Sequence, residues 1–290
     1  MNKPNLFIVG LPKCGTTFLY HYLSKHPQIF FPKFKEPHYF GSDLIRQNGS
    51  YSLNFEEYIS LFNSKKKIIG EASTFYMFSK LASREIYKFN PNAKIIIMLR
   101  DLVDLAHSMH SQFVFSGDEK IEDFESALKA EKKRYELREK PKQTTILNKL
   151  FYKNNILSIP ENIRSFQELF GKENIKFIFL DEIQNNPRKV LKDTFLFLKV
   201  DNNFPIENFK VINQNKRYRF KFVRDFIKNF SIKLGKIRSF FIAKPIGIIK
   251  FLENINKIET QRKSLPKNLK QDLKKYFSKT ENEINQLIKS

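Results

Sequence analysis

A short loop near the N-terminus, bracketed by Gly10 and Gly15, carries residues suited to binding an oxyanion. The apolar run at residues 6–9 is typical of a buried strand, and the segment after Gly15 has the pattern of an amphipathic helix. A strand–loop–helix points backbone N–H groups and the positive end of a helix dipole at one spot. That spot favours an oxyanion, most often a phosphate, so the sequence predicts a phosphate site in this loop.

The loop differs from the phosphate-binding motif of nucleotide hydrolases, G-x-x-x-x-G-K-[ST], in the place of its lysine. Thr16 follows the second glycine directly, and the lysine lies inside the loop, at Lys13. A Pro-Lys-x-Gly-Thr-Thr loop after a first strand resembles the 5′-phosphosulfate loop of sulfotransferases that use 3′-phosphoadenosine 5′-phosphosulfate (PAPS). The resemblance implies donor contacts from six residues: Pro12, Lys13, Cys14, Gly15, Thr16 and Thr17. The alternative is a plain strand–helix turn in which Thr16 caps the helix and Lys13 is solvated.

A second candidate binding segment follows the β-branched, apolar run at residues 94–99, which is typical of a central parallel strand. Arg100 comes directly after that run, at the end of the strand where open α/β sheets bind ligands, and Ser108 lies two helical turns further on. The segment from the arginine to the serine is similar to the 3′-phosphate-binding segment of the same sulfotransferases. The resemblance implies that Arg100 and Ser108 hold the 3′-phosphate. An ion pair of Arg100 with Asp101 or Asp104 is the alternative.

A candidate catalytic segment lies between these two, where residues 33–40 read Lys-Phe-Lys-Glu-Pro-His-Tyr-Phe. Pro37 is expected to hold the backbone of Glu36 extended, and apolar neighbours to raise the pKa of its carboxyl toward neutrality, with Lys35 opposing that shift. The segment resembles one in the heparan sulfate N- and 3-O-sulfotransferases and their bacterial relatives, which implies that Glu36 is the base that deprotonates the acceptor. His38 is the second candidate base, because cytosolic small-molecule sulfotransferases use a histidine. The alternatives are an exposed carboxylate paired with a lysine, and a histidine packed in the core.

Two weaker matches lie toward the C-terminus. The basic loop at residues 213–219 stands about where family members carry a loop that folds over the nucleotide, which implies that Arg217 and Arg219 add contacts to the 3′-phosphate. Residues 265–277 resemble the final helix of the family. Apolar positions at helical spacing predict its buried face: Leu269, Leu273, Tyr276 and Phe277.

Two further positions bear on the resemblance. Ala72 stands where heparan-type members often carry an active-site lysine, so that Lys13 or Lys35 would have to supply the positive charge alone. Cys14 is the one cysteine of the chain, which excludes an intrachain disulfide and a cysteine-based metal site. Its place at a helix N-terminus beside Lys13 predicts a lowered thiol pKa.

Alternating strand and helix patterns predict an α/β fold, a P-loop-like three-layer arrangement with a central parallel sheet flanked by helices. The expected strands are residues 6–9, 67–70, 94–99 and 175–180. Residues 119–140 are predicted to form a charged helix with one solvated face. All 290 residues fit one domain, residues 1–290, whose C-terminal part from about 220 to 290 is expected to be wholly helical.

The chain is strongly basic: 52 Lys and Arg against 30 Asp and Glu give a net charge of +22. This excess indicates an anionic partner or a general amino-acid bias. Zinc-ligand spacing, a recognition-helix pattern and an aromatic RNA-binding signature are all missing from the sequence, so nucleic acid is not the expected partner. A polyanionic nucleotide donor and an anionic carbohydrate acceptor account for the charge with fewer assumptions.

The sequence shows no export signal or transmembrane helix at its start, since residues 1–4 lead straight into the first strand. We therefore expect a cytoplasmic protein. The apolar run at residues 239–249 is too short to span a bilayer and is broken by Pro245. A buried helix pair is the favoured interpretation of this run, and contact with a membrane surface is the alternative.

Taken with these patterns, the family resemblance implies an enzyme that transfers a sulfuryl group from PAPS to a hydroxyl or amine of an acceptor, with carbohydrate favoured. Lys13 would neutralise the bridging oxygen as the S–O bond breaks, leaving 3′,5′-adenosine bisphosphate without need of a metal. One alternative is a P-loop kinase-like phosphotransferase, which would need a lysine after Gly15 and an acidic metal ligand at a strand end. The other is a non-catalytic basic nucleotide-binding protein, against which the presence of Lys13, Glu36, Arg100 and Ser108 argues.

Overall fold

The computed structural model describes residues 3–44, 53–138, 151–206, 209, 216–218, 257–259 and 262–289. Its centre is a five-stranded sheet with the order β2-β3-β1-β4-β5, in which all neighbouring strands are parallel. The strands, in sheet order, are β2 (Ile29–Phe30), β3 (Ile68–Ala72), β1 (Leu6–Ile8), β4 (Lys94–Leu99) and β5 (Ile175–Phe179). Nearly every residue of β1, β3 and β4 is buried, as expected for a parallel sheet covered on both faces.

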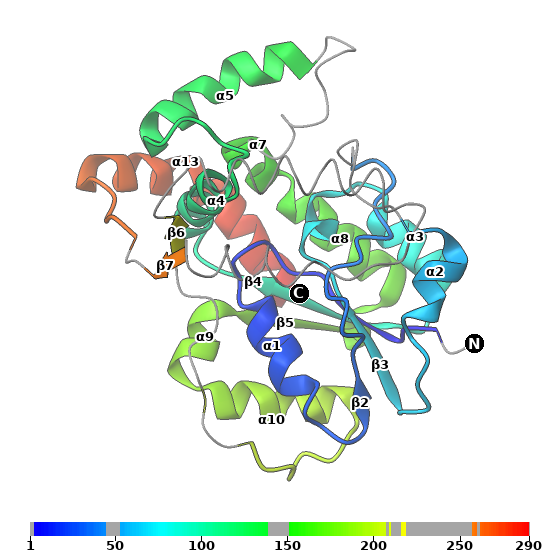
Figure 1. Cartoon of the computed structure of the whole chain (residues 1–290). Coiled ribbons are helices and arrows are strands. Elements are labelled where there is room, and N and C mark those ends of the chain that lie inside the picture. The colour runs from blue at the N-terminus through cyan, green and yellow to red at the C-terminus, as the bar shows by residue number, and fades with distance from the viewer. Residues whose placement is uncertain are drawn as a thin grey trace.

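Helices cover both faces of the sheet, which gives three layers (Figure 1). Helices α1 and α10 pack together on one face, and α3 and α8 pack together on the other, with α13 against α8 and α4. The helices are α1 (Thr16–Leu23), α2 (Phe55–Ser60), α3 (Ala82–Phe89), α4 (Leu102–Ser116), α5 (Phe124–Arg138), α7 (Tyr152–Leu157), α8 (Ile159–Phe170), α9 (Leu180–Asn185), α10 (Pro187–Leu198) and α13 (Lys267–Lys289), with 3₁₀ turns η1 (Thr74–Phe78) and η3 (Lys172–Asn174). The predicted α/β fold with a parallel sheet is confirmed.

The strand order places a topological switch at β1. The chain leaves β1 toward β2 and β3, then crosses back over β1 to reach β4 on its other side. Open α/β sheets bind their ligands outside the carboxyl ends of strands at such a switch. The segments that follow β1, β3 and β4 start at Val9, Ser73 and Arg100, so the switch brings three chemically distinct segments to one edge of the sheet.

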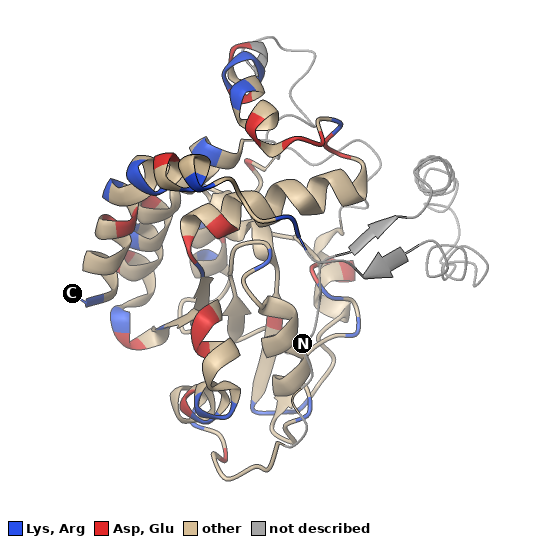
Figure 2. Cartoon of the chain, turned by 90° about the vertical axis from the view of Figure 1, so that its left-hand side faces the viewer, with Lys and Arg blue, Asp and Glu red and all other residues tan. Residues whose placement is uncertain are grey.

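The four predicted strands are found, with the 94–99 strand matching exactly and the others shifted by one or two residues at their ends. The edge strand β2 was not predicted; it has two residues and pairs with β3. The charged helix starts at Phe124, later than predicted, where the carboxylate of Asp123 accepts a hydrogen bond from Ser126 N at 2.7 Å. In Figure 2 basic and acidic residues alternate along this helix, at the top of the view.

The C-terminal part departs from the prediction in two ways. A second, antiparallel sheet pairs β6 (Lys216–Tyr218) with β7 (Lys257–Glu259), so the region beyond residue 220 is not wholly helical. In α13, Leu273 and Phe277 are buried as predicted, but Tyr276 is 47% exposed because the buried stripe continues through Thr280 and Ile284 instead. Leu269 is partly buried against the core.

The apolar run at residues 239–249 lies outside the described part of the chain. Among the helices that the structure does describe, none has the length and apolar character needed to cross a membrane.

Candidate active site

The loop after β1 is shaped by two glycines. A Cβ atom on Gly10 would lie 2.7 Å from both Met98 Cβ and Thr16 Cγ2, so only glycine lets the loop pass this close to β4. Gly15 has a φ of 87°, the left-handed region that glycine adopts without strain, and is the N-cap of α1. No side chain caps this helix end, so the alternative in which Thr16 is the cap is not what the structure has. Its backbone N–H groups and dipole are directed at the loop, as an anion site requires.

Arg100 ties this loop to the end of β4. Its Nη1 donates a hydrogen bond to the carbonyl oxygen of Lys13 at 3.0 Å, and its Nη2 lies 3.5 Å from a carboxylate oxygen of Asp104. The alternative ion pair with Asp104 is therefore present, while Asp101 caps α4 by accepting a hydrogen bond from Asp104 N at 2.8 Å. The buried Nε of Arg100 has no hydrogen-bond partner among the described residues, so a donor remains for a ligand. Nearby, Lys13 Nζ donates to Gln112 Oε1 at 3.5 Å.

A second arginine, Arg262, joins this cluster from the segment before α13. Its Nη2 donates to Ser108 Oγ at 3.2 Å, and its buried Nε likewise lacks a partner within the described part of the chain. Burial, and then the positive charge of Arg100, lower the pKa of the Arg262 guanidinium. Two guanidinium groups this close repel each other, and a bound anion would relieve that repulsion.

Arg262 was missed by the sequence analysis, which assigned the extra phosphate contacts to Arg217 and Arg219. The backbone of Arg217 lies in β6, which runs beside α4, and Arg219 lies outside the described residues. The signal that could have found Arg262 is the basic pair it forms with Lys263, directly ahead of the final helix.

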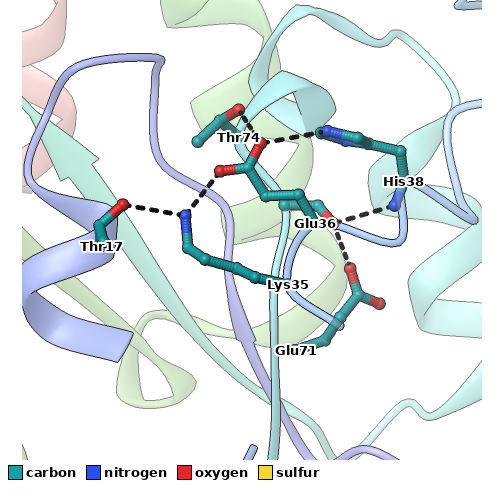
Figure 3. A network of polar contacts seen from close by, with 7 residues as sticks. Thr17, Lys35, Glu36, His38, Glu71 and Thr74 are labelled. Carbon is teal, nitrogen blue, oxygen red and sulfur yellow. Dashed lines mark hydrogen bonds and ion pairs between the residues drawn. The ribbon is translucent and has the colours of Figure 1, made fainter. Parts of the chain in front are cut away.

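The Glu36 carboxylate lies at the centre of a polar network over the carboxyl end of the sheet (Figure 3). Its Oε1 is 2.6 Å from Lys35 Nζ, and its Oε2 is 3.3 Å from His38 Nε2 and 3.5 Å from Thr74 Oγ1. The same Lys35 Nζ donates to Thr17 Oγ1 at 3.1 Å. The network therefore joins the candidate base to the candidate phosphate loop. The lysine pair of the alternative is present, with Lys35, on a Glu36 side chain that is 32% exposed.

The electrostatics and backbone of Glu36 both differ from expectation. Burial alone would raise its pKa, but a hydrogen bond from His38 and the charge and hydrogen bond of Lys35 outweigh burial and lower the pKa to about 2. The predicted upward shift is therefore wrong for this state of the site. The predicted extended backbone is also wrong, because Glu36 has a φ of 59° and His38 a φ of 47°, both in the left-handed region. Glu36 and His38 lie on either side of Pro37, and their left-handed conformation turns the loop back over the sheet.

Cys14 is packed into the core rather than presented at the helix end. Its side chain is fully buried, and burial raises the thiol pKa to about 12 although the charge of Arg100 opposes the shift. The predicted lowered pKa is therefore wrong, since loss of solvent outweighs the nearby positive charge. Among the described residues no group of three or more His, Cys, Asp or Glu is arranged to hold a metal ion.

Comparison with known families agrees with this geometry. The family model "Sulfotransferase domain" matches residues 3–242. The chain belongs to the sulfotransferase family. The predicted family resemblance is thereby confirmed. The matched segment of this sulfotransferase includes every strand of the central sheet.

Two of the relatives of this sulfotransferase have a carbohydrate in their names. It is 26% identical to carbohydrate sulfotransferase 15 of Mus musculus over 68% of this chain and 44% of that protein. It is 24% identical to the bifunctional heparan sulfate N-deacetylase/N-sulfotransferase 1 of Caenorhabditis briggsae, over 70% of this chain and 23% of that protein. A membrane-associated sulfotransferase of Dictyostelium discoideum is 41% identical over 37% of this chain and 22% of its own length. The chain thus spans less than half the length of these relatives.

A solved structure shares the fold. The sulfotransferase of Alicyclobacillus acidocaldarius superimposes with a TM-score of 0.64 at 27% identity, over 86% of this chain and all of that one. Within this sulfotransferase, Ala72 ends β3 opposite Ile8 of β1 and is 3% exposed. Position 72 therefore supplies no lysine side chain. The cation that contacts the Glu36 carboxylate is Lys35, at 2.6 Å.

Proposed function

We propose that this chain transfers a sulfuryl group from PAPS to a hydroxyl or amine of a carbohydrate. One observation carries the proposal: the Lys35 ammonium binds Thr17 of the phosphate loop and the Glu36 carboxylate at once. A group that moves from a donor in the loop to an acceptor beside the carboxylate would pass this cation.

The donor would be held at two places. Lys13, the N–H groups at the start of α1 and the hydroxyls of Thr16 and Thr17 would bind the 5′-phosphosulfate. Arg100, Ser108 and Arg262 would bind the 3′-phosphate. The residues fit such a donor, because the α1 N-terminus lacks a side-chain cap and two buried guanidinium nitrogens lack partners among the described residues. A nucleotide without a 3′-phosphate would leave the two arginines with the Asp104 carboxylate as counter-charge.

The transfer itself needs charge stabilisation and one proton acceptor. PAPS supplies the sulfuryl group, and the electron pair of the breaking S–O bond goes to the bridging oxygen of the phosphate. Lys13 and the α1 N-terminus would stabilise that charge as it develops. Glu36 would accept the proton of the attacking hydroxyl or amine.

Glu36 is a weak base as the structure has it, because its pKa is lowered to about 2. Lys35 would change this when the donor binds. Its ammonium would then be shared with the sulfuryl oxygens next to Thr17, and the carboxylate would lose part of the charge that holds its pKa down. Basicity would rise only when the donor is in place. We assign His38 the role of orienting the carboxylate through its 3.3 Å contact with Oε2.

The preference for carbohydrate is supported by the names of the relatives, which include a carbohydrate sulfotransferase and a heparan sulfate N-sulfotransferase. The cytoplasmic location and the single-domain organisation expected from the sequence stay predictions.

The first test is ligand stabilisation in a thermal-shift titration without magnesium, comparing 3′,5′-adenosine bisphosphate with ADP. A ligand that binds only the folded chain raises its stability by mass action. Stabilisation by the bisphosphate and not by ADP supports the donor assignment. The reverse result favours the kinase-like alternative.

The second test is transfer of ³⁵S from labelled PAPS to chondroitin, to N-desulfated heparin and to 4-nitrophenol. We expect label on a polysaccharide and none on the phenol. Bisphosphate binding with no transfer to any acceptor would favour the non-catalytic binding protein.

The variant Arg100→Ala should lose the bisphosphate shift, while Arg164→Ala, which removes an exposed arginine of α8, should keep it.

A further inference from the structure

Glu71 is a buried carboxyl group with no place in the reaction as proposed. It lies in β3, one residue before the strand ends, and is 1% exposed. Burying a carboxyl group is costly unless hydrogen bonds compensate it. Burial raises the pKa of Glu71, and hydrogen bonds from surrounding hydroxyl groups oppose that shift. A group retained at this cost beneath the catalytic loop calls for an explanation.

Three hydroxyl groups converge on this carboxyl. Tyr58 OH donates to Oε2 and Ser73 Oγ donates to Oε1 at 2.7 Å, and the Tyr76 hydroxyl is a third polar neighbour that lowers the pKa of the Glu71 carboxyl. All three side chains are buried, with exposures of 0 to 1%. The carboxyl is thus the common acceptor of the Tyr58 and Ser73 hydroxyl protons.

Two of these hydroxyls also hold the backbone of the catalytic loop. The N–H of His38 donates to Ser73 Oγ at 3.2 Å, and the N–H of Phe40 donates to Tyr76 OH at 3.2 Å (Figure 3 shows the first of these chains). Ser73 therefore connects the amide of His38 to the carboxyl group underneath the loop, and Tyr76, a polar neighbour of the same carboxyl, holds the amide of Phe40.

Tyr58, which carries the third hydroxyl, contacts Tyr39, the residue between His38 and Phe40. The ring of Tyr58 stacks on that of Tyr39, with centroids 4.2 Å apart and planes 13° apart. Three successive loop residues thus rest on the three partners of Glu71. The same loop holds the left-handed backbone of Glu36 and His38, a conformation that persists only where the surroundings enforce it.

The direction of the hydrogen bonds depends on the carboxyl group. A backbone N–H can only donate, so Ser73 Oγ and Tyr76 OH must accept from the loop. The Ser73 hydroxyl has one proton, and that proton is given to Glu71 Oε1. A glutamine at this position has one acceptor oxygen instead of two, so the Ser73 and Tyr58 protons would no longer both find an acceptor on residue 71, and the support of the loop would weaken.

We propose that Glu71 is a positioning residue, which through Ser73 and Tyr76 fixes the loop so that the Glu36 carboxylate meets Lys35 beside the donor loop. The inference rests on the proposed function, in which Glu36 is the base. Holding a base in place before the substrates arrive removes a large part of the cost of orienting it during the reaction.

Hydrogen–deuterium exchange of the loop amides tests the anchoring without any substrate. In Glu71→Gln and in Tyr76→Phe, the amides of His38 and Phe40 should exchange about tenfold faster, as expected for one lost hydrogen bond. The matched control is Tyr152→Phe, because Tyr152 is also fully buried and donates to a buried carboxylate, that of Glu119, at 3.0 Å. Unchanged exchange in the loop of both variants would overturn the inference.

The kinetic readout separates positioning from mere folding. With the polysaccharide acceptor found by ³⁵S transfer, Glu71→Gln should lower kcat at least tenfold and leave the KM for PAPS and the thermal shift by the bisphosphate unchanged. Loss of bisphosphate binding together with kcat would show a general structural role and overturn the inference. If Glu71→Gln does not fold, Ser73→Ala removes one chain alone and must show the same split.

Failure of the proposed function would look different. A wild-type chain that neither binds the bisphosphate nor transfers label would refute the sulfotransferase mechanism proposed above, while the exchange experiment would still report whether Glu71 anchors the loop.

Discussion

The ammonium of Lys35 lies 3.1 Å from the hydroxyl oxygen of Thr17, which joins the loop after β1 to the loop that carries the candidate base. Thr17 is the second residue of α1, and the rest of α1 and β2 lie between it and Lys35. The parallel sheet brings them together because they follow the carboxyl ends of β1 and β2, two parallel strands with β3 between them. A cation at this junction can respond to what binds on either side.

Removal of this cation should raise the pKa of Glu36, because the charge and the hydrogen bond of Lys35 both lower it. In Lys35→Met we expect kcat to fall and the acidic limb of the kcat/KM profile to move to higher pH. The measurement is the rate of ³⁵S transfer between pH 4 and 9. Lys33→Met is the control, since Lys33 is an exposed lysine of the same loop. The wild-type limb lies below this range, because the pKa of Glu36 is about 2, so a Lys35→Met profile as flat as the wild type down to pH 4 would contradict the assigned role of Lys35.

The lowered pKa of Glu36 also predicts how stability depends on pH. A carboxyl whose pKa is lower in the folded chain stabilises the fold above its unfolded pKa, and this contribution is lost as the pH falls through the folded value. For Glu36 the window runs from about 4.5 down to about 2. The melting temperature of the wild type should exceed that of Glu36→Gln at pH 6, and the difference should shrink as the pH falls through this window. A difference that grows on acidification would refute the lowered pKa, and Glu56→Gln controls for the loss of an exposed charge.

Arg262 should discriminate nucleotides by their 3′-phosphate. A charge-assisted hydrogen bond contributes about 1.5–3 kcal/mol, so Arg262→Ala should weaken binding of 3′,5′-adenosine bisphosphate by about 10- to 100-fold. Binding of AMP, which lacks the 3′-phosphate, should be unchanged. Isothermal titration calorimetry of both nucleotides gives the two affinities. Equal losses for the bisphosphate and AMP would place Arg262 elsewhere on the nucleotide.

Lys13 should act on the transition state more than on the bound donor, because negative charge develops on the bridging oxygen only as the S–O bond breaks. Removing one such stabilising group typically lowers kcat by about 10²–10³-fold. We therefore expect Lys13→Ala to lower kcat by this order and to change the KM for PAPS less than tenfold. Single-turnover ³⁵S transfer separates the two effects. A large rise in KM with kcat retained would make Lys13 a binding residue only.

The sequence predicted those elements whose conformation depends mainly on residues within the element itself. β4 matches exactly because its six residues form one unbroken, mostly apolar run that ends at Arg100. The two glycines of the phosphate loop were informative for a similar reason, since the conformation of Gly15 and the close approach at Gly10 leave no other residue type. β2 could not be predicted, because its two residues take their conformation from pairing with β3.

The parts of the site that were missed depend on contacts between distant segments. Glu36 owes its low pKa to His38 as well as to Lys35, and the backbone of His38 is held by Ser73, which lies 35 residues away. Arg262 reaches Ser108 across 154 residues of sequence. No pattern within either segment shows which distant residue it will contact. The lowered pKa of Glu36 and the place of Arg262 in the site therefore do not follow from the sequence alone.

Cys14 offers a test of how tightly the loop is packed in the free protein. Thiols react as thiolates, and a pKa of about 12 leaves about one thiol in ten thousand ionised at pH 8. Full burial of the side chain adds a steric barrier. We expect 5,5′-dithiobis(2-nitrobenzoic acid) to label the folded chain at least a hundredfold more slowly than the chain in urea, and the bisphosphate to slow labelling further because it binds and stabilises the folded chain. Labelling of the folded chain as fast as that of the unfolded chain would show that the loop opens readily and that the thiol is not held in the core.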